Sequence, residues 1–315
     1  MAKHNSKKIR RTNPSGSHQI NWLWGQESVL ETLRAERWRV YELFLTAEVS
    51  HQHRELLKAK QKIKRKPNQK TSENTSETVD EKHSIEIEIV SAAKLEELAK
   101  TTEHEGIVAR VSKYPYESLE ILESVRTTEP MALATGFVSS TVSDITPEAI
   151  AYGSGKTPFS LPHPLVVVID RVQDAFTFAS ILRCCEAARV SAVIVGQFCQ
   201  AQVTTQVARA SSGAVNHFPI IQADDLASAT QQLKDLGFQL IAIDPQSQFD
   251  VCDKPLALPL AVVLASDTLG LDPKILEICD HRVRIPTLGK TNPLLSAVAA
   301  GILLYETRRQ QRGVI

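Results

Sequence analysis

The stretch that decides the fold reads Leu165-Val166-Val167-Val168-Ile169-Asp170. An unbroken apolar run that ends in a carboxylate is typical of a strand buried on both faces, as in a parallel sheet. A helix is predicted directly after it, from Phe176 to Ala188. The alternation continues, with strands expected at 192–195, 215–220, 239–243, 260–264 and 281–285 and helices at 201–210, 224–236, 273–279 and 294–309. This pattern predicts a parallel α/β domain over residues 161–315.

A smaller α/β domain is predicted upstream, over residues 19–117. Its patterning indicates strands at 40–45, 85–90 and 107–111 and helices at 26–35, 54–66 and 94–99. Two polar stretches have too few apolar residues to form a core and are expected to be disordered: a basic tail at 1–18 and an insertion near 68–84. Residues 118–160, which are rich in Gly, Ser, Thr and Pro, are expected to form a linker.

The charges of the chain cancel, but they are not evenly distributed. Lys plus Arg and Asp plus Glu each number 36, which argues against a protein that grips nucleic acid by bulk positive charge. Residues 1–70, however, carry a net charge of +10, residues 71–160 carry −9 and residues 161–315 carry −1. The basic end is open to two interpretations, a solubilising tail or an arm that contacts phosphates.

Several classes of protein are disfavoured by composition. No run of 18 apolar residues occurs, so no membrane span is expected, and the basic N-terminus lacks the apolar core of a signal peptide. The five cysteines include no Cys-x-x-Cys pair, which disfavours a disulfide framework or a zinc site. We therefore expect a cytoplasmic protein without a metal.

Ligands of parallel α/β folds bind at the carboxyl ends of the strands, so the loops after the expected strands come into question. The loop 170–175 has no glycine, which disfavours a dinucleotide-binding oxidoreductase. The loops 265–271 and 286–293 contain small residues that would let a ligand lie against the main chain.

Five motifs, taken in order and spacing, resemble the SpoU-type RNA 2′-O-ribose methyltransferases of the SPOUT superfamily. The first is an apolar strand followed by Asp-x-Val-x-Asp and a helix with Ile-Leu-Arg. The matching residues are Asp170, Val172, Asp174, Ile181, Leu182 and Arg183, then Ser211-Ser212-Gly213-Ala214, Ala265 to Leu271, Cys279-Asp280 with Ile285-Pro286, and Gly289 with the helix from Leu294. The N-terminal half resembles the substrate-binding domain of that family through Trp24-Gly25 and His104-Glu105-Gly106-Ile107.

The resemblance implies a C-terminal domain with a trefoil knot, S-adenosylmethionine (SAM) as the cofactor, RNA as the substrate and a homodimer. Cofactor contacts in the family are largely made by main chain. Carried over residue by residue, they fall on Ala265, Ser266, Gly270, Ile285, Pro286, Gly289 and Leu294.

The catalytic residues implied by the resemblance are only partly matched. Arg183 stands at the position of the family arginine, where we expect it to stabilise charge and anchor phosphate. Asp267 replaces the family Glu, and Thr177 replaces an Asn. In the last motif Pro293 and Leu295 replace Ser and Asn, so the neighbouring Asn292 and Ser296 are the candidates to take over their hydrogen bonds.

The function expected from this resemblance is SAM-dependent methylation of a ribose 2′-hydroxyl in rRNA or tRNA. The alternative is a catalytically impaired homologue that binds RNA without methylating it. Retained Arg183 and Asp267 favour the enzyme, whereas Pro293 and Leu295 favour the alternative.

Overall fold

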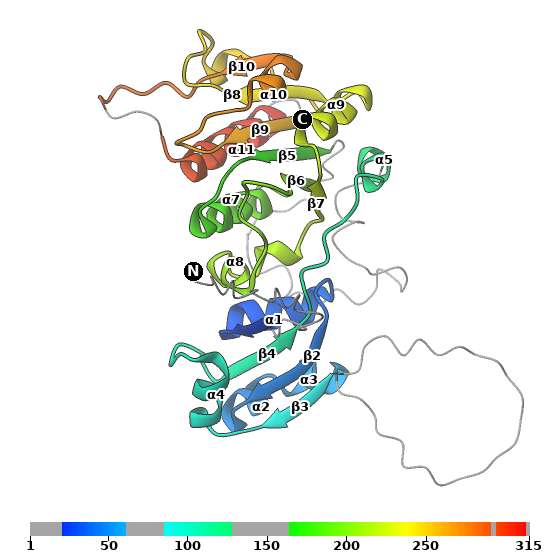
Figure 1. The fold of residues 1–315 in the computed structure, drawn as a ribbon, viewed down its shortest axis with the longest axis vertical. Helices are drawn as coiled ribbons and strands as arrows, with labels where there is room; N and C mark the ends of the chain where they lie inside the picture. The colour runs from blue at the N-terminus through cyan, green and yellow to red at the C-terminus, as the bar shows by residue number, and fades with distance from the viewer. Residues whose placement is uncertain (1–20, 61–84, 128–163, 291–293, 313–315) are drawn as a thin grey trace, which may run out of the picture.

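The computed structural model describes residues 21–60, 85–127, 164–290 and 294–312. These residues form two sheets with their own helices, the N-terminal one below and the C-terminal one above in Figure 1. The tail 1–18, the insertion 68–84, Asn292, Pro293 and the end of the predicted helix 54–66 lie outside the described residues.

The N-terminal sheet has the strand order β1-β4-β2-β3. Its strands are β1 (Asn21–Trp24), β2 (Val40–Leu45), β3 (Glu86–Ile89) and β4 (Ile107–Val111), and its helices are α1 (Gln26–Ala35), α2 (Ala47–Gln52), α3 (Arg54–Lys60) and α4 (Ala92–Ala99). Strand β4 runs antiparallel to β1 and β2, and β2 runs parallel to β3. Because α1 and α4 pack on opposite faces, this small domain buries both sides of β4. A small α/β domain is confirmed.

The two short motifs of the N-terminal half meet at the start of α1. The Glu105 carboxylate accepts a hydrogen bond of 2.7 Å from the backbone N–H of Gln26, the first residue of α1. A carboxylate at a helix N-terminus satisfies free N–H groups and opposes the helix dipole. The residues after Trp24-Gly25 and those around His104-Glu105 therefore support one another, although they are far apart in sequence.

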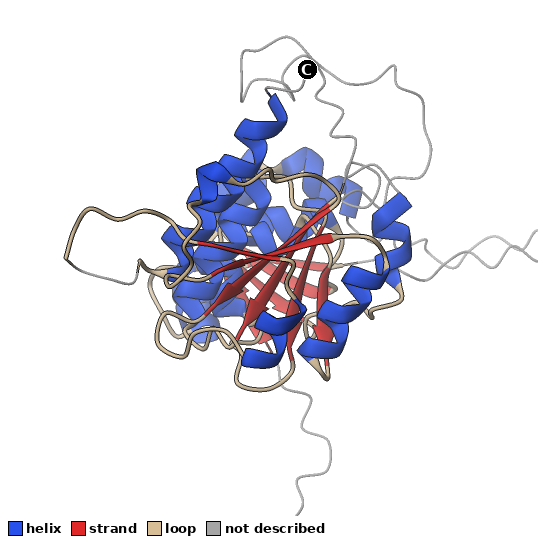
Figure 2. Ribbon diagram, turned by 90° about the horizontal axis from the view of Figure 1, so that it is seen from above, coloured by secondary structure: helices blue, strands red, loops and turns tan. Residues whose placement is uncertain are grey.

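The C-terminal sheet has the order β10-β8-β9-β5-β6-β7, and all neighbouring strands are parallel. Its strands are β5 (Leu165–Asp170), β6 (Ala192–Gly196), β7 (Ile220–Ala223), β8 (Gln239–Ile243), β9 (Leu260–Ala265) and β10 (His281–Val283). Helices α7 (Ala175–Ala187), α8 (Thr205–Ala210) and α11 (Ser296–Arg312) pack on one face, and α5 (Ile121–Thr127), α9 (Leu226–Asp235) and α10 (Pro273–Ile278) on the other. Figure 2 shows the strands between these two layers.

Strand β5 explains why its sequence is apolar throughout. Leu165, Val167 and Ile169 belong to the core on the α7 side, and Val166 and Val168 to the core on the α9 side. Helices cover both faces of a parallel sheet, so the side chains that point to either face are apolar. The predicted strand 165–170 and the parallel α/β class are confirmed.

The strand predicted at 215–220 is wrong. Residues Ala214–Asn216 form a short 3-10 helix, and β7 begins only at Ile220. Gly213, with φ of 82°, turns the chain after α8, and the Asn216 side chain donates to the Gly213 carbonyl at 3.1 Å. Val215 and Phe218 are buried in this turn, so their apolar character reflects packing of the turn and not strand pairing.

Two further expectations concern the path of the chain. Helix α5 lies within the predicted linker 118–160 and packs on the C-terminal sheet through Leu122 and Val125. The trefoil knot and the domain boundaries stay predictions.

The two domains are joined by buried contacts. The Tyr114 hydroxyl donates to the Val215 carbonyl at 2.7 Å, and the Asn216 amide donates to Thr32 Oγ1 at 3.0 Å. Arg209 of α8 lies over the Trp24 ring at 4.5 Å. Together with the ion pair between Glu31 and His217, these contacts form what we call the domain joint.

Candidate active site

The candidate site lies between β5 and β9, where the connections of the sheet turn from one side to the other. From β5 the chain proceeds through β6 and β7 on one side and then crosses to β8 and β9 on the other. At such a point the loops after two adjacent strands diverge and leave room for a ligand. Asp170, the last residue of β5, pairs directly with Ala265, the last residue of β9. The loop 265–272 after β9 therefore begins beside the end of β5.

Asp267 and Ser296 join the loop 265–272 to the first residue of α11. The backbone N–H of Ser296 donates to Asp267 Oδ1 at 2.9 Å, and the Ser296 hydroxyl also contacts this carboxylate. The same hydroxyl lies 2.6 Å from the Ala265 carbonyl oxygen. Asp267 thus accepts a hydrogen bond from a free N–H at the start of α11, where the helix dipole favours a negative charge. Three predicted site residues, Ala265, Asp267 and Ser296, are brought together here.

Arg183 lies on the solvent-exposed face of α7. One helical face carries the exposed residues Phe176, Ser180 and Arg183, while Cys184 turns inward towards the Ala297 carbonyl of α11. The Arg183 side chain makes no hydrogen bond or ion pair with another described residue. The structure therefore leaves this cation available to an anionic ligand but does not bring it into contact with Asp267.

Thr177 occupies the first turn of α7. Its backbone N–H donates to Asp174 Oδ2 at 2.6 Å, which caps the helix. This hydrogen bond holds the pKa of Asp174 below its usual range. Thr177 serves the helix start through its main chain, and the described contacts do not join its side chain to Asp267 or Ser296.

The second predicted cofactor loop stands apart from the first. Ile285 is half-buried, but Pro286 and Gly289 are exposed, and the Leu288 side chain is 105 % exposed. In Figure 1 this orange segment extends away from the body of the domain. Leu294, beyond it, is half-buried next to the start of α11. No described contact joins residues 286–290 to the loop 265–272.

Asp170 and Arg171, which were not among the predicted site residues, act on the loop 265–272 from the end of β5. Asp170 Oδ2 accepts the backbone N–H of Asp272 at 2.8 Å, and Arg171 Nη2 donates to the Gly270 carbonyl at 3.0 Å. Burial raises the pKa of Asp170, while the Asp272 N–H and Arg171 oppose this rise. The motif match at Asp170 was a signal for this role, but only the pairing of β5 with β9 reveals its partner.

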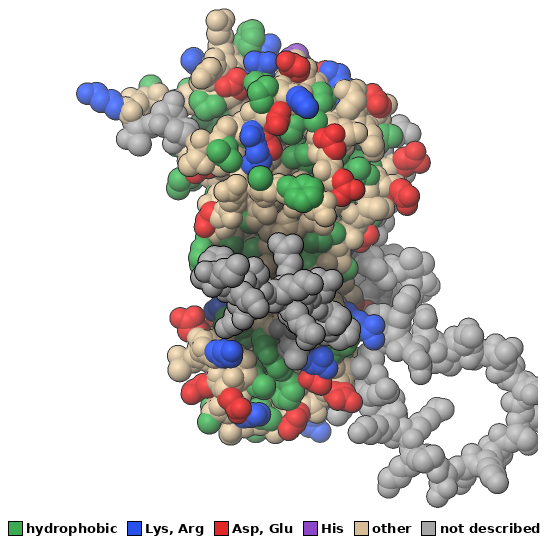
Figure 3. Space-filling model, viewed as in Figure 1, with side chains coloured by type: hydrophobic (Ala, Val, Ile, Leu, Met, Phe, Trp, Pro, Cys, Tyr) green, Lys and Arg blue, Asp and Glu red, His purple; other side chains and the backbone are tan. Residues whose placement is uncertain are grey.

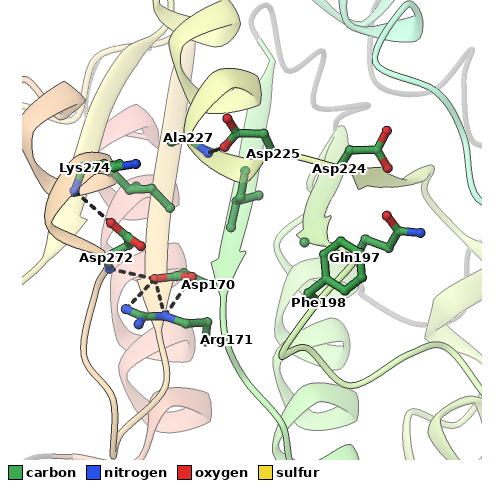
Figure 4. Close-up of a pocket in the computed structure, with 12 residues that line it drawn as sticks. Asp170, Arg171, Gln197, Phe198, Asp224, Asp225, Ala227, Asp272 and Lys274 are labelled. Atoms are coloured by element: carbon green, nitrogen blue, oxygen red, sulfur yellow. Dashed lines mark hydrogen bonds and ion pairs between the residues drawn. The ribbon is translucent and has the colours of Figure 1, made fainter.

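A cavity of about 220 Å³ opens beside these two residues, at the carboxyl ends of β5, β6 and β7. Figure 4 shows Asp170, Arg171 and Asp272 on one side and Gln197, Phe198 and Asp224 on the other. Its remaining lining residues are Gly196, Asp225, Leu226, Ala227, Lys274 and Ile275. None of the site residues predicted from the sequence line this cavity.

Metal-ligating groups do not form a cluster in the described part of the chain. Within it, no group of three or more His, Cys, Asp or Glu residues stands close enough to hold a metal ion. All five cysteines are free. Among the described helices, none is long and apolar enough to cross a bilayer.

The fold and this site define an α/β protein with two sheets and a candidate ligand site at the carboxyl ends of parallel strands. Residues 164–305 match the SpoU rRNA Methylase family, and residues 77–117 match the family described as RNA 2′-O ribose methyltransferase substrate binding. The two matches together cover more than half of the chain. Residues 164–305 therefore belong to the SpoU rRNA Methylase family and residues 77–117 to its RNA substrate-binding family, which confirms the resemblance seen in the motifs.

Relatives agree along most of the chain. A Bacillus subtilis protein, YacO, whose name places it in the TrmH family of tRNA/rRNA methyltransferases, is 26 % identical over 95 % of this chain and 99 % of its own length. A Staphylococcus saprophyticus protein with the same family name is 32 % identical over 46 % of this chain and 59 % of its own. The crystal structure of the SpoU methyltransferase AviRb from Streptomyces viridochromogenes with AdoMet has a TM-score of 0.63 at 20 % identity, covering 93 % and 90 % of the two chains, and shows that the fold is shared.

Proposed function

We propose that this protein transfers a methyl group from SAM to a ribose 2′-hydroxyl of rRNA or tRNA. The observation that carries the proposal is the attachment of the loop 265–272 to the start of α11 through Asp267 and Ser296, in a domain of the SpoU family. The names of the relatives and the AdoMet bound to similar structures support the same activity. The match of residues 77–117 to a substrate-binding family supports RNA as the substrate.

The residues at the carboxyl end of β9 fit this cofactor. A Cβ added at Gly270, which has a φ of 64°, would meet no atom within 4 Å, so there is open space beside the main chain. Leu269 is 52 % exposed and offers an apolar surface next to it. Ala265, Ser266, Gly270 and Leu294 would hold the adenosyl group by main chain and apolar contact, and Ile285, Pro286 and Gly289 stay predictions for the same role. When bound, SAM supplies an electrophilic methyl group.

Arg183 is the residue that we expect to act on the RNA. A ribose hydroxyl is a weak nucleophile at neutral pH, and a fixed cation stabilises the negative charge that develops on its oxygen. A guanidinium also binds phosphate through paired hydrogen bonds. Arg183 is exposed and unpaired among the described residues, as both roles require. Asp267 and Ser296 keep the cofactor loop next to α11, and Thr177 and Asn292 stay predicted site residues.

The decisive experiment measures transfer of a radiolabelled methyl group from SAM to total RNA. Arg183→Ala should lower the rate by about 100-fold, since losing one preorganised charge-stabilising donor has an effect of that order. Arg189→Ala removes an exposed arginine just beyond the same helix and is expected to keep the activity of the wild type. A wild-type protein that binds SAM and RNA without methyl transfer would support the impaired RNA-binding homologue instead.

We further propose that the protein is a homodimer that pairs through α11. Leu295, which directly precedes α11, and Val298, Ile302 and Tyr305 on one face of the helix are 64, 46, 37 and 70 % exposed. A contiguous exposed apolar face of this kind is typical of an interface. We favour a second copy of this chain as the partner that covers this face. Helix α11 packs against α7, whose outer face carries the exposed Phe176 and Arg183, so a second copy on α11 would lie close to Arg183.

Val298→Glu tests the dimer by placing a charge at the centre of this face. Sedimentation at micromolar concentration should show a dimer for the wild type and a monomer for Val298→Glu, since burying an unpaired charge opposes association. Ile89→Glu changes an apolar residue of β3 that is 60 % exposed and should leave the dimer intact. A monomeric wild type would contradict the proposal.

The cytoplasm, where RNA substrates are found, is the location that we propose.

A further inference from the structure

The loop 265–272 contains hydrogen bonds between its own residues. The Gly270 N–H donates to the Ser266 carbonyl at 3.0 Å, and the Thr268 N–H lies 3.3 Å from Ser266 Oγ. The residues at its tip, Thr268 and Leu269, are exposed. A short loop with an exposed tip keeps one shape only if its base is attached to a rigid element.

Asp170 and Arg171 attach this base to the central strand β5 at three points. The Ser266 N–H donates to the Asp170 carbonyl at 3.1 Å. The Asp272 N–H donates to Asp170 Oδ2 at 2.8 Å. Arg171 Nη2 donates to the Gly270 carbonyl at 3.0 Å, and Arg171 Nε lies 3.2 Å from both carboxylate oxygens of Asp170. The two side chains therefore bind each other and the C-terminal end of the loop, whereas its N-terminal end is bound by the Asp170 main chain.

The backbone at Arg171 has an unfavourable conformation that places its side chain. Arg171 has a φ of 56°, in the left-handed region that residues other than glycine rarely adopt. The side chain of Asp170 is 6 % exposed, and that of Arg171 is 28 % exposed. A buried carboxylate needs a partner, and Arg171 supplies it while donating to Gly270.

We propose that Asp170 and Arg171 are positioning residues that hold the loop 265–272 in the shape that binds SAM. They act through the main chain of Ser266, Gly270 and Asp272 and need no contact with the cofactor themselves. This inference rests on the proposed function, because it takes the loop 265–272 to be the cofactor loop. The two arginines would then have different roles: Arg183 would act on the RNA, and Arg171 would act on the cofactor loop.

The test compares SAM binding by calorimetry in the full-length wild type, Arg171→Ala and Arg171→Lys. Arg171→Ala should raise the Kd for SAM about tenfold, as expected for loss of a charged hydrogen-bond network, and leave the Kd for RNA unchanged. The KM for SAM should rise with it, while kcat changes less. Arg171→Lys keeps a cation within reach of Gly270 and should recover part of the affinity. Arg189→Ala is the matched control, because Arg189 is also left-handed, with a φ of 50°, and exposed.

Coupling between the two residues gives a second measurement. Asp170→Asn keeps an acceptor for the Asp272 N–H but loses the charge that holds Arg171. The double variant should therefore raise the Kd for SAM little more than Arg171→Ala alone, since coupled residues are not additive. Hydrogen exchange in residues 266–272 without SAM should quicken in Arg171→Ala.

The outcomes separate this inference from the proposed function. A wild-type protein that binds no SAM would overturn the proposed function and with it the role of the pair. A wild type that binds SAM, together with a folded Arg171→Ala whose Kd is unchanged, would overturn this inference alone. Equal loss of affinity for SAM and RNA in Arg171→Ala would also overturn it, because it would indicate a general structural defect.

Discussion

At the scale of single residues, Ser296 links several parts of the candidate site. Its N–H and hydroxyl both contact Asp267, and its hydroxyl also contacts the Ala265 carbonyl. The family position for a serine is Pro293, three residues earlier, and Ser296 is one of the two neighbours that the sequence predicts as replacements. The structure supports the hypothesis that a neighbouring serine replaces the lost hydrogen bonds, although its contribution to catalysis stays a prediction.

Ser296→Ala should lower both stability and SAM affinity. It removes one buried hydroxyl that lies between a carboxylate and a carbonyl oxygen, and such a loss costs about 1–2 kcal/mol in the free energy of unfolding. Denaturant unfolding measures the first effect and calorimetry the second. Ser180→Ala removes an exposed hydroxyl whose hydrogen bond stays within α7, and it should change neither quantity. Equal effects of the two substitutions would contradict this interpretation.

At the scale of elements, α11 stabilises the end of α7. Arg308 donates to the carbonyls of Ala188 and Arg189 at 2.7 and 2.8 Å, just beyond the last turn of α7. The last carbonyls of a helix have no partner within the helix, so a side chain from another element can satisfy them. Burial lowers the pKa of Arg308 to about 10, so it stays protonated at neutral pH.

Arg308→Ala should lower the free energy of unfolding by about 1–2 kcal/mol, because it leaves the partly buried Ala188 carbonyl and the exposed Arg189 carbonyl without this donor. The neighbouring Arg309 provides the control, since its pair with Glu306 lies within α11 and its side chain is 56 % exposed. Arg309→Ala should leave the stability close to that of the wild type, because an exposed ion pair contributes little. Urea unfolding of both variants measures the difference, and similar midpoints would contradict a capping role for Arg308.

At the scale of the whole molecule, Gly213 lets the two domains approach closely. It has a φ of 82°, and an added Cβ would lie 2.6 Å from Glu31 Cβ of the other domain. Gly237 has a similar φ of 86° but nothing within 4 Å of the same position. Comparing substitutions at Gly213 and Gly237 therefore distinguishes the cost of backbone strain from the cost of a clash between the domains.

Gly237→Ala should cost about 1 kcal/mol from the left-handed conformation alone. Gly213→Ala should cost at least about 1 kcal/mol more, because the domain joint must open or shift. Thermal unfolding gives the two values, and hydrogen exchange in α1 shows whether the joint is affected. Equal costs for the two variants would mean that the domain joint accommodates the added Cβ without loss of stability, which would contradict this prediction.

The ion pair between Glu31 and His217 makes the domain joint sensitive to pH. Glu31 raises the pKa of His217 above 6.5, and hydrogen bonding to His217 lowers the pKa of Glu31 below 4.5. The histidine contribution is complete below pH 6.5 and is lost as pH rises through the raised pKa. The carboxylate contribution is complete above pH 4.5 and is lost as pH falls through the lowered pKa. The joint should therefore be strongest between these values.

Raising the pH from 6 to 9 should weaken the joint by a few tenths to about 1 kcal/mol, since the pair is partly exposed. Hydrogen exchange of α1 and of residues 214–217 measures this change. Arg34 and Arg37 face the same pair, and Glu186 lies near His217. His217→Gln should remove the dependence, whereas His51→Gln, in α2, should not. A pH dependence that persists in His217→Gln would point to another group.

The sequence by itself determined the parallel α/β domain, most of its strands and helices, and the family. These follow from local patterns, because a strand covered on both faces must be apolar along its length and short motifs keep their order and spacing. It did not reveal the turn at 214–216, since buried residues of a turn and of a strand have the same apolar pattern.

Only the tertiary structure decided which residues of the site meet. Asp170 and Ala265 are almost a hundred positions apart, yet the pairing of β5 with β9 places Arg171 beneath Gly270. Ser296 reaches Asp267 because α11 begins beside the end of β9. Such contacts depend on strand order and on where a helix starts, and neither quantity is encoded in the spacing of residues along the chain.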